Sequence, residues 1–215
     1  MQDDREALYR SRTRIYELVH LIIVNVDAMT RQAPDILEGS STIATKRKAE
    51  AYQVVDDSDD EVFQYDLYDW YLTQGWEDRL LNVQSSFVVS YLQDKAVTNA
   101  SHADLLWQYY SLSQRYFDAA DVQLHLATSD FPIPLEKRIE YLSKAKANAS
   151  TTTPGVSRQG RQVLLHDISE QLDVANIQDD LLSRLMEDER LRPEKKQEVI
   201  KHLDGKIIGL SDVST

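Results

Sequence analysis

The residues with the clearest potential for chemistry are a run of carboxylates at 56–61, DDSDDE. Carboxylate oxygens are hard ligands that suit Mg²⁺, and several of them on one helix could hold metal ions against a diphosphate. Such a site requires the run to line a cavity, with a second acidic motif facing it. Asp179-Asp180 is followed by Leu-Leu-Ser and does not supply that second motif.

The pattern Asp56-Asp57-x-x-Asp60 matches the metal-binding motif of all-α prenyl-diphosphate enzymes, so a magnesium-dependent enzyme of that class is one hypothesis. The competing interpretation is a charged turn that caps the next helix. Ser58 and Glu61 have the spacing of a capping box, and acidic residues favour a helix N-terminus. We favour the cap, because it accounts for the whole run. Ser58, surrounded by carboxylates, is also a candidate phosphorylation site.

Other signals of catalysis are weak. The 5 histidines are scattered without an HExxH pair, and the chain has no cysteine, no phosphate-binding glycine loop and no nucleophile elbow. His20 and His125 fall among apolar positions, where we expect satisfied core or interface histidines. Arg138-Ile139-Glu140 is interpreted as pairing on a helix surface and hydrogen bonding between helices. We therefore predict that the chain is not an enzyme and needs neither a cofactor nor a metal.

Charge and hydropathy narrow the classes of partner. The formal net charge of -12 argues against direct binding of nucleic acid, because each phosphate contact needs a local cation. The basic cluster at 46–48 is interpreted as a solvated helix face. The most apolar segment, residues 18–26, is interrupted by His20 and Asn25 and is too short to cross a bilayer. We therefore expect neither a nucleic-acid partner nor a transmembrane segment.

The elements that position these residues are predicted to be helices throughout, since the chain contains only 6 glycines and 5 prolines. A long first helix is expected at about 3–31. A flexible acidic or polar connection is expected at about 34–60, with a short helix at 43–55 inside it. The buried stripe of the first helix has near-heptad spacing. It comprises Leu8, Ile15, Val19, Ile22, Val26 and Met29.

The remainder alternates helices with short turns. Helices are expected at about 61–75, 76–83 and 86–95, where the many tyrosines and tryptophans are predicted to form core. Three further helices are expected within 101–149, with Leu112 on the buried face of the first. After a loop at about 150–160, a long helix at about 161–188 places Asp179 on its apolar seam. A last helix is expected at 194–203.

Residues 101–149 carry the most specific signal, and at this stretch the chain resembles a known family. DLLWQYYSLSQRYFDAADVQLHLATS at 104–129 and LEKRIEYLSKAKANA at 135–149 look like the C-terminal solenoid of inner-ring nucleoporins of the 155/170-kilodalton class. YDLYDWYLTQGWEDRLLNVQSSFVVSYL at 65–92 and LHDISEQLDVANIQDDLL at 165–182 extend the likeness. The resemblance covers roughly residue 66 to the end, and the acidic run at 56–60 has no counterpart in it.

The resemblance implies an all-α fold of stacked antiparallel helices in an irregular α-solenoid, forming one fragment over residues 1–215 of a larger chain. It also implies a structural scaffold of the nuclear pore complex at the nuclear envelope, supporting nucleocytoplasmic transport of protein and mRNA. The expected partners are linear segments of a linker nucleoporin of the 98-kilodalton, FG-bearing type and neighbouring inner-ring scaffold subunits.

Capture of a linear segment needs a groove between helices with apolar anchors. The candidate partner-binding residues are Tyr109, Tyr110 and Tyr116, because the tyrosines of these two helices exceed what one buried face can absorb. A generic helical-repeat adaptor of a coat or other assembly is the alternative function, although no fixed repeat period is visible.

Overall fold

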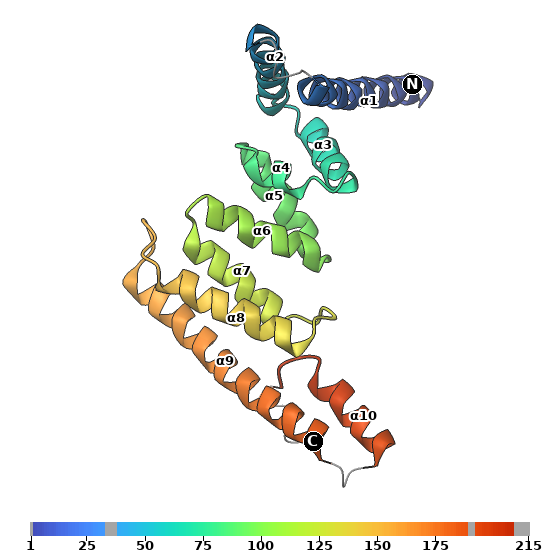
Figure 1. Ribbon diagram of the computed structural model, residues 1–215. Helices are drawn as coiled ribbons and strands as arrows, with labels where there is room; N and C mark the ends of the chain where they lie inside the picture. The colour runs from blue at the N-terminus through green and yellow to red at the C-terminus, as the bar shows by residue number, and fades with distance from the viewer. Residues whose placement is uncertain (1, 33–37, 189–191, 209–215) are drawn as a thin grey trace. The chain divides into compact units, whose positions relative to one another are not determined.

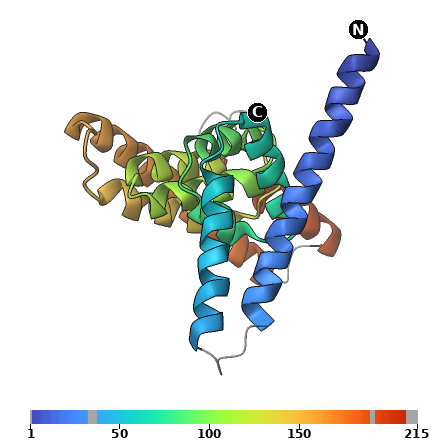
Figure 2. The same ribbon diagram turned by 90° about the horizontal axis from the view of Figure 1, so that it is seen from above.

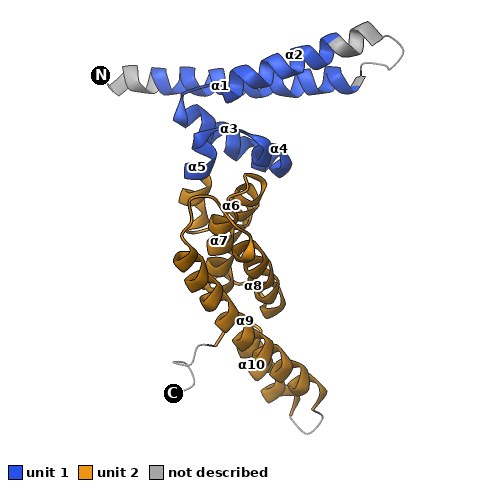
Figure 3. Ribbon diagram, turned by 90° about the vertical axis from the view of Figure 1, so that its left-hand side faces the viewer, with its two compact units in different colours: residues 1–91 blue, residues 92–215 orange. Residues whose placement is uncertain are grey.

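A computed structural model describes residues 2–32, 38–188 and 192–208, with side chains at 8–31, 43–188 and 192–208. Every regular element among these residues is an α-helix (Figure 1), so the prediction of an all-α fold is confirmed. The chain divides into two compact units, unit 1 at residues 1–91 and unit 2 at residues 92–215 (Figure 3). Within each unit, helices pack on other helices of the same unit, and the single fragment over residues 1–215 stays a prediction.

Unit 1 is built around a pair of long helices. α1 and α2 pack on each other (Figure 2), and α3 packs on both α1 and α4. Gly75 adopts a positive φ of 68° at the turn after α3, a conformation that glycine adopts without strain. Three of the aromatic residues predicted to form core do so, since Tyr68, Tyr71 and Tyr91 are at most 1% exposed, whereas Trp70 and Trp76 are half-buried. The helices are α1 (Gln2–Gln32), α2 (Glu38–Asp56), α3 (Glu61–Thr73), α4 (Glu77–Asn82) and the first part of α5 (Ser86–Ala96).

Unit 2 stacks consecutive helices, α6 on α7, α7 on α8 and α8 on α9, as Figure 1 shows. Alanines at the centre of α7 allow close approach, and Ala119, Ala120 and Ala127 are fully buried. Leu126 and Leu142 are also fully buried, and each such side chain contributes about 1.5–3 kcal/mol relative to exposure. The helices are α6 (Ala100–Leu112), α7 (Tyr116–Thr128), α8 (Leu135–Ser150), α9 (Arg158–Glu187) and α10 (Pro193–Leu203).

The two predicted connections are shorter than expected. α2 occupies residues 38–56, so most of the predicted flexible connection at about 34–60 is helix, and residues 33–37 lie outside the described residues. The segment KRKAEAYQ within α2 contains strong helix formers, which outweigh its polar character. The loop predicted at about 150–160 spans residues 151–157, between α8 and α9.

The predicted apolar face of α1 is wrong at several positions. On α1, Leu8, Ile15 and Met29 are 56–70% exposed, whereas Ile23 and Asp27 are buried. The buried face of this helix carries polar groups that find partners on α2, α3 and α4, so hydrophobic periodicity alone points to the wrong side. On α9 the apolar seam is buried as predicted at Ile168, Ala175 and Leu182, although Gln178 rather than Asp179 is buried beside it.

Leu112 is also more exposed than predicted, at 64%. It is the last residue of α6, and the backbone then turns through Gln114, which has a positive φ of 59°. A residue at the end of a helix has no following turn to cover it, so the helical stripe does not extend to this position.

Buried polar side chains hold the turns between helices. Gln64 donates from Nε2 to the carbonyls of Val55 at 2.8 Å and Ser58 at 3.0 Å, closing the turn from α2 to α3. Gln178 donates to the carbonyls of Leu203 at 2.6 Å and Lys206 at 3.0 Å, which ties the segment after α10 to α9. These contacts satisfy carbonyls that helix ends leave without partners.

Arg138 performs the same role in unit 2, at the turn from α7 to α8. Its side chain is 2% exposed and donates four hydrogen bonds to backbone carbonyls. The interpretation of Arg138 as a helix-surface residue is therefore wrong, because its donors are all directed at a turn that sequence patterns do not reveal. The acceptors are Ala127 at 2.7 Å, Ser129 at 2.8 Å, Phe131 at 2.7 Å and Ile133 at 3.0 Å.

Candidate functional site

The aspartate-rich run does not form a metal site among the described residues, where no group of three histidine, aspartate or glutamate residues could hold an ion. Asp60 is the N-cap of α3 and accepts hydrogen bonds from the backbone of Val62 at 3.1 Å and Phe63 at 3.2 Å. A capping interpretation was therefore right in kind, but the cap is Asp60 rather than the predicted Ser58. The Asp60 carboxylate also accepts from Arg12 of α1 at 2.8 Å.

The carboxylates of the run point to different surroundings. Asp60 faces α1, whereas Asp56 ends α2 and lines a pocket of unit 1. Asp57 and Asp59 are exposed. Their separation removes the geometry on which the prenyl-diphosphate hypothesis depended, since that chemistry needs carboxylates converging on one ion.

The histidines occupy separate environments. His20 stacks on Trp70 with ring centroids 4.2 Å apart, and its Nε2 lies 3.2 Å from the Asp66 carboxylate. His20 is thus partly buried and near a carboxylate, but its Nε2 has no hydrogen-bond partner among the described residues, so the prediction of a satisfied core histidine is only partly right. His125 is exposed, contrary to prediction, because it lies on the outer face of α7.

His20 should make unit 1 sensitive to mild acid. Burial lowers the pKa of His20 below its usual value of 6.5, and the nearby Asp66 and Glu17 offset this only in part. The unfolded chain therefore takes up a proton more readily than the folded chain, so stability is present above pH 6.5 and is lost as the pH falls through the folded pKa. We expect His20→Phe, which keeps the stack on Trp70, to flatten this loss between pH 7 and about 5.5.

The measurement is urea unfolding in a Trp107→Phe background, monitored by tryptophan fluorescence. Of the 3 tryptophans in the chain, this leaves Trp70 and Trp76, both in unit 1. An identical pH dependence with and without His20→Phe would contradict the assignment.

The three candidate tyrosines differ in accessibility. Tyr110 is 3% exposed, its hydroxyl accepts from Gln93 at 3.0 Å, and the Arg115 guanidinium lies 4.3 Å from its ring centroid. Tyr109 is 9% exposed. These two residues are interior, so neither offers an accessible anchor. Tyr116, at the start of α7, retains partial exposure.

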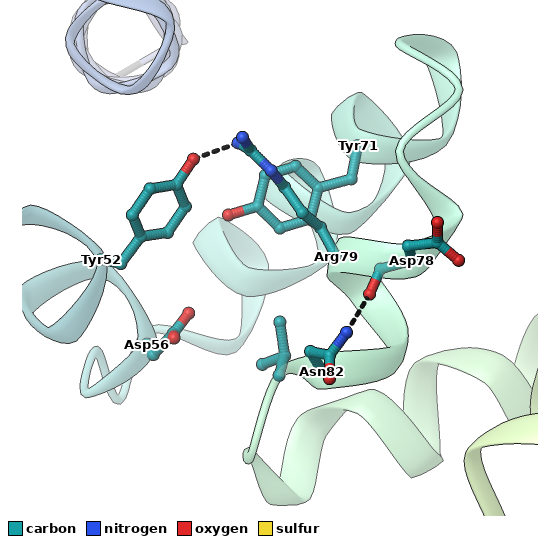
Figure 4. Close-up of a pocket in the computed structure, with 7 residues that line it drawn as sticks. Tyr52, Asp56, Tyr71, Asp78, Arg79 and Asn82 are labelled. Carbon is teal, nitrogen blue, oxygen red and sulfur yellow. Dashed lines mark hydrogen bonds between the residues drawn. The ribbon is translucent and has the colours of Figure 1, made fainter. Parts of the chain in front are cut away.

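The better-formed candidate site is a pocket of about 310 Å³ within unit 1, between the end of α2, α3 and α4. Figure 4 shows the Asp56 carboxylate and the Tyr71 hydroxyl facing the same space, with the Tyr52 ring beside it. Asn82 donates to the backbone carbonyl of Asp78 at 2.6 Å and so closes one wall. The full lining is Tyr52, Asp56, Tyr71, Asp78, Arg79, Asn82 and Val83.

Arg79, the cationic residue in the pocket lining, already has an acidic partner. Arg79 donates to the carboxylate of Asp27, a residue of α1 that is 2% exposed, and to the Tyr52 hydroxyl. Tyr52 donates to Asp27 Oδ1 at 3.2 Å, and Lys48 Nζ lies 3.1 Å from the same oxygen. Lys48 is thus tied to a buried carboxylate, so the basic cluster at 46–48 is more than a solvated face.

Two polar atoms of the pocket lack hydrogen-bond partners among the described residues. They are Asp56 Oδ1 and the Tyr71 hydroxyl, both buried. Burial raises the pKa of Asp56, and the neighbouring Asp57 raises it further. Burial also raises the pKa of Tyr71, with a smaller contribution from the Asp56 charge. The pocket therefore presents an acceptor carboxylate and a phenol that would gain from a ligand with N–H donors.

Sequence patterns indicated Asp56 but missed Asp27, Tyr52, Tyr71 and Arg79 as members of one site. Asp27 offers a usable signal, since it is a carboxylate within an apolar helical stretch, and such a residue requires a buried partner. Nothing in the sequence indicates which cation supplies it.

Comparisons with known proteins agree on one family. The model of the family described as Nucleoporin_C, the non-repetitive/WGA-negative nucleoporin C-terminal family, matches residues 1–213. Nucleoporin NUP170 of Chaetomium thermophilum is 45% identical over 211 residues, which cover 98% of this chain and 15% of that protein. Nucleoporin NUP170 of Saccharomyces cerevisiae is 33% identical over 216 residues, covering 98% of this chain and 14% of that protein.

Solved structures show the same similarity. The crystal structure of the Chaetomium thermophilum Nup170 CTD-Nup145N complex matches with a TM-score of 0.86 and 44% identity, covering 97% of this chain and 40% of that one. The structure of the Chaetomium thermophilum Nup170 CTD matches with a TM-score of 0.83 and 44% identity, covering 98% of this chain and 38% of that one. The chain thus spans about 15% of the length of the curated relatives that it matches.

Proposed function

The chain belongs to the non-repetitive/WGA-negative nucleoporin C-terminal family, and from this premise we propose that it is a scaffold segment that binds a linear segment of a linker nucleoporin. As a nucleoporin segment, it belongs at the nuclear pore complex in the nuclear envelope. The linker is of the 98-kilodalton, FG-bearing type, and neighbouring inner-ring scaffold subunits are the second class of partner. Supporting nucleocytoplasmic transport is the role of such an assembly.

The observation that carries the proposal is the likeness to the Nup170 CTD solved as a complex with Nup145N, at 44% identity over 97% of this chain. We expect these helices to offer a similar surface to a similar ligand. A groove between helices can bury the apolar anchors of an extended or helical peptide while polar groups at its rim satisfy the peptide backbone.

An enzymatic role receives no support from these relatives, which are nucleoporins. No helix among the described residues combines the length and apolar character that crossing a bilayer requires. The generic coat adaptor is a less specific form of the same scaffold function, and family membership favours the nuclear pore.

The test is titration calorimetry of the chain against peptides tiled along a linker nucleoporin of the 98-kilodalton type. We expect saturable binding to one peptide, weakened by about tenfold or more when its apolar anchors become alanine. Tyr116→Ala should weaken binding if α7 contributes to the groove. Tyr9→Ala, at a tyrosine of α1 that is 67% exposed, is the matched control and should leave the affinity unchanged. Absence of binding to every peptide would contradict the proposal.

A further inference from the structure

The pocket at the end of α2 contains hydrogen-bonding capacity that the described residues leave unused. Tyr71 is 1% exposed, yet its hydroxyl has no partner among them, and Asp56 Oδ1 is in the same situation. A buried polar group without a partner destabilises a protein, and native structures contain few of them. Both atoms face one space, as Figure 4 shows, so one ligand group could satisfy both.

The charges around the pocket indicate whether that ligand is a cation or an anion. Arg79 and Lys48 both contact Asp27, and Asp56 forms no ion pair with any of the described residues. Asp57, the nearest neighbour along the chain, adds a second negative charge, and the whole chain carries -12. An anionic ligand would be repelled by the Asp56 carboxylate, and no cation paired with Asp56 would offset that repulsion. A cationic ligand is therefore favoured.

The chemistry of the wall favours an organic cation over a metal ion. Of the two aspartates that line the pocket, Asp56 directs its carboxylate into the space, whereas the Asp78 side chain points away from it in Figure 4. A single carboxylate is a poor binding site for a divalent metal ion. The aromatic rings of Tyr52 and Tyr71 line the same space. A guanidinium or ammonium group donates to carboxylate and phenol oxygens and is attracted to aromatic faces. A volume of about 310 Å³ accommodates the end of one side chain.

We propose that this pocket binds the guanidinium or ammonium group of a basic side chain in a linear partner peptide, with Asp56 and Tyr71 as its hydrogen-bond acceptors and Tyr52 as an aromatic wall. The inference rests on the proposed function, for which it names a basic anchor beside the apolar ones. Binding in this pocket should depend on the negative charge of Asp56, whereas binding in an apolar groove should not.

The direct test is NMR titration of the chain with N-acetyl-arginine methylamide, followed at the methyl groups of Val83, which line the pocket. We expect saturable shifts with this probe and none with the neutral isostere N-acetyl-citrulline methylamide. Asp56→Asn should weaken binding by about 10- to 100-fold, the range for a charge-assisted contact. Asp59→Asn removes the same charge at an exposed position and should change the affinity less than about twofold.

Tyr71→Phe provides a second variant that keeps the shape of the core. Since the hydroxyl has no partner among the described residues, the fold should be retained while the affinity for the arginine probe falls several-fold. Absence of saturable shifts, equal shifts with the citrulline probe, or equal losses in Asp56→Asn and Asp59→Asn would each overturn the inference.

Calorimetry with linker peptides separates this inference from the proposed function. A linker peptide could bind with an affinity that is unchanged both by Asp56→Asn and by replacing the peptide's basic residues with glutamine. In that case the basic anchor is wrong while peptide binding stands. If the arginine probe binds and no linker peptide does, the pocket stands and the proposed partner is wrong.

Discussion

Replacing Arg138 with methionine is expected to lower the free energy of unfolding of unit 2 by about 3–5 kcal/mol. The guanidinium is 2% exposed and supplies hydrogen bonds to four carbonyls of the turn between α7 and α8. Methionine fills a similar volume but donates no hydrogen bond, so these carbonyls would be left buried without that donor. Arg138→Lys should recover little, because an ammonium lacks the planar fork that reaches four acceptors.

Amide hydrogen exchange resolved by peptide is the appropriate measurement, since the chain contains two units and a single unfolding transition is not assured. We expect protection to fall throughout α7 and α8. Arg184→Met is the matched control, because the side chain of this arginine of α9 is 74% exposed and pairs with Asp180 at the helix surface. Its substitution should change stability by less than about 0.5 kcal/mol. Equal effects of the two substitutions would refute the role assigned to Arg138.

Replacing Asp27 with asparagine is expected to lower the free energy of unfolding of unit 1 by about 2–4 kcal/mol. Asp27 is 2% exposed and contacts Tyr52, Lys48 and Arg79, so its charge links α1 to α2 and α4. Asparagine keeps the shape but leaves both cations without a counter-charge. Lys48 is 38% exposed and can recover water contacts, which places the estimate below that for a fully buried pair.

Urea unfolding in the Trp107→Phe background would report this loss from Trp70 and Trp76. Asp59→Asn provides the control at an exposed position of the same unit. The double variant Asp27→Leu with Arg79→Met should recover part of the stability, because removing both charges leaves no buried ion unpaired. A double variant less stable than Asp27→Asn alone would show that packing, rather than charge pairing, dominates at this position.

The fold was largely predictable from sequence, whereas the candidate site was not. The starts and ends of α3, α5, α6 and α10 follow capping and turn residues, which act locally and can be read from short segments. The buried face of α1 could not be predicted, because Tyr16 and Asp27 are buried on account of partners on other helices. The interior position of Tyr110 could not be predicted for a similar reason, since it is covered by Gln93 and Arg115.

By itself, the sequence determined that the chain is helical, that it carries an excess of carboxylates and that it resembles a nucleoporin solenoid. Helix propensity, capping and composition are local properties, so tertiary contacts do not need to be known. Only the tertiary structure decided which carboxylate pairs with Arg79 and which is left facing a pocket. The roles of Asp27 and Asp56 depend on atoms far away in the chain, and the two side-chain types are identical.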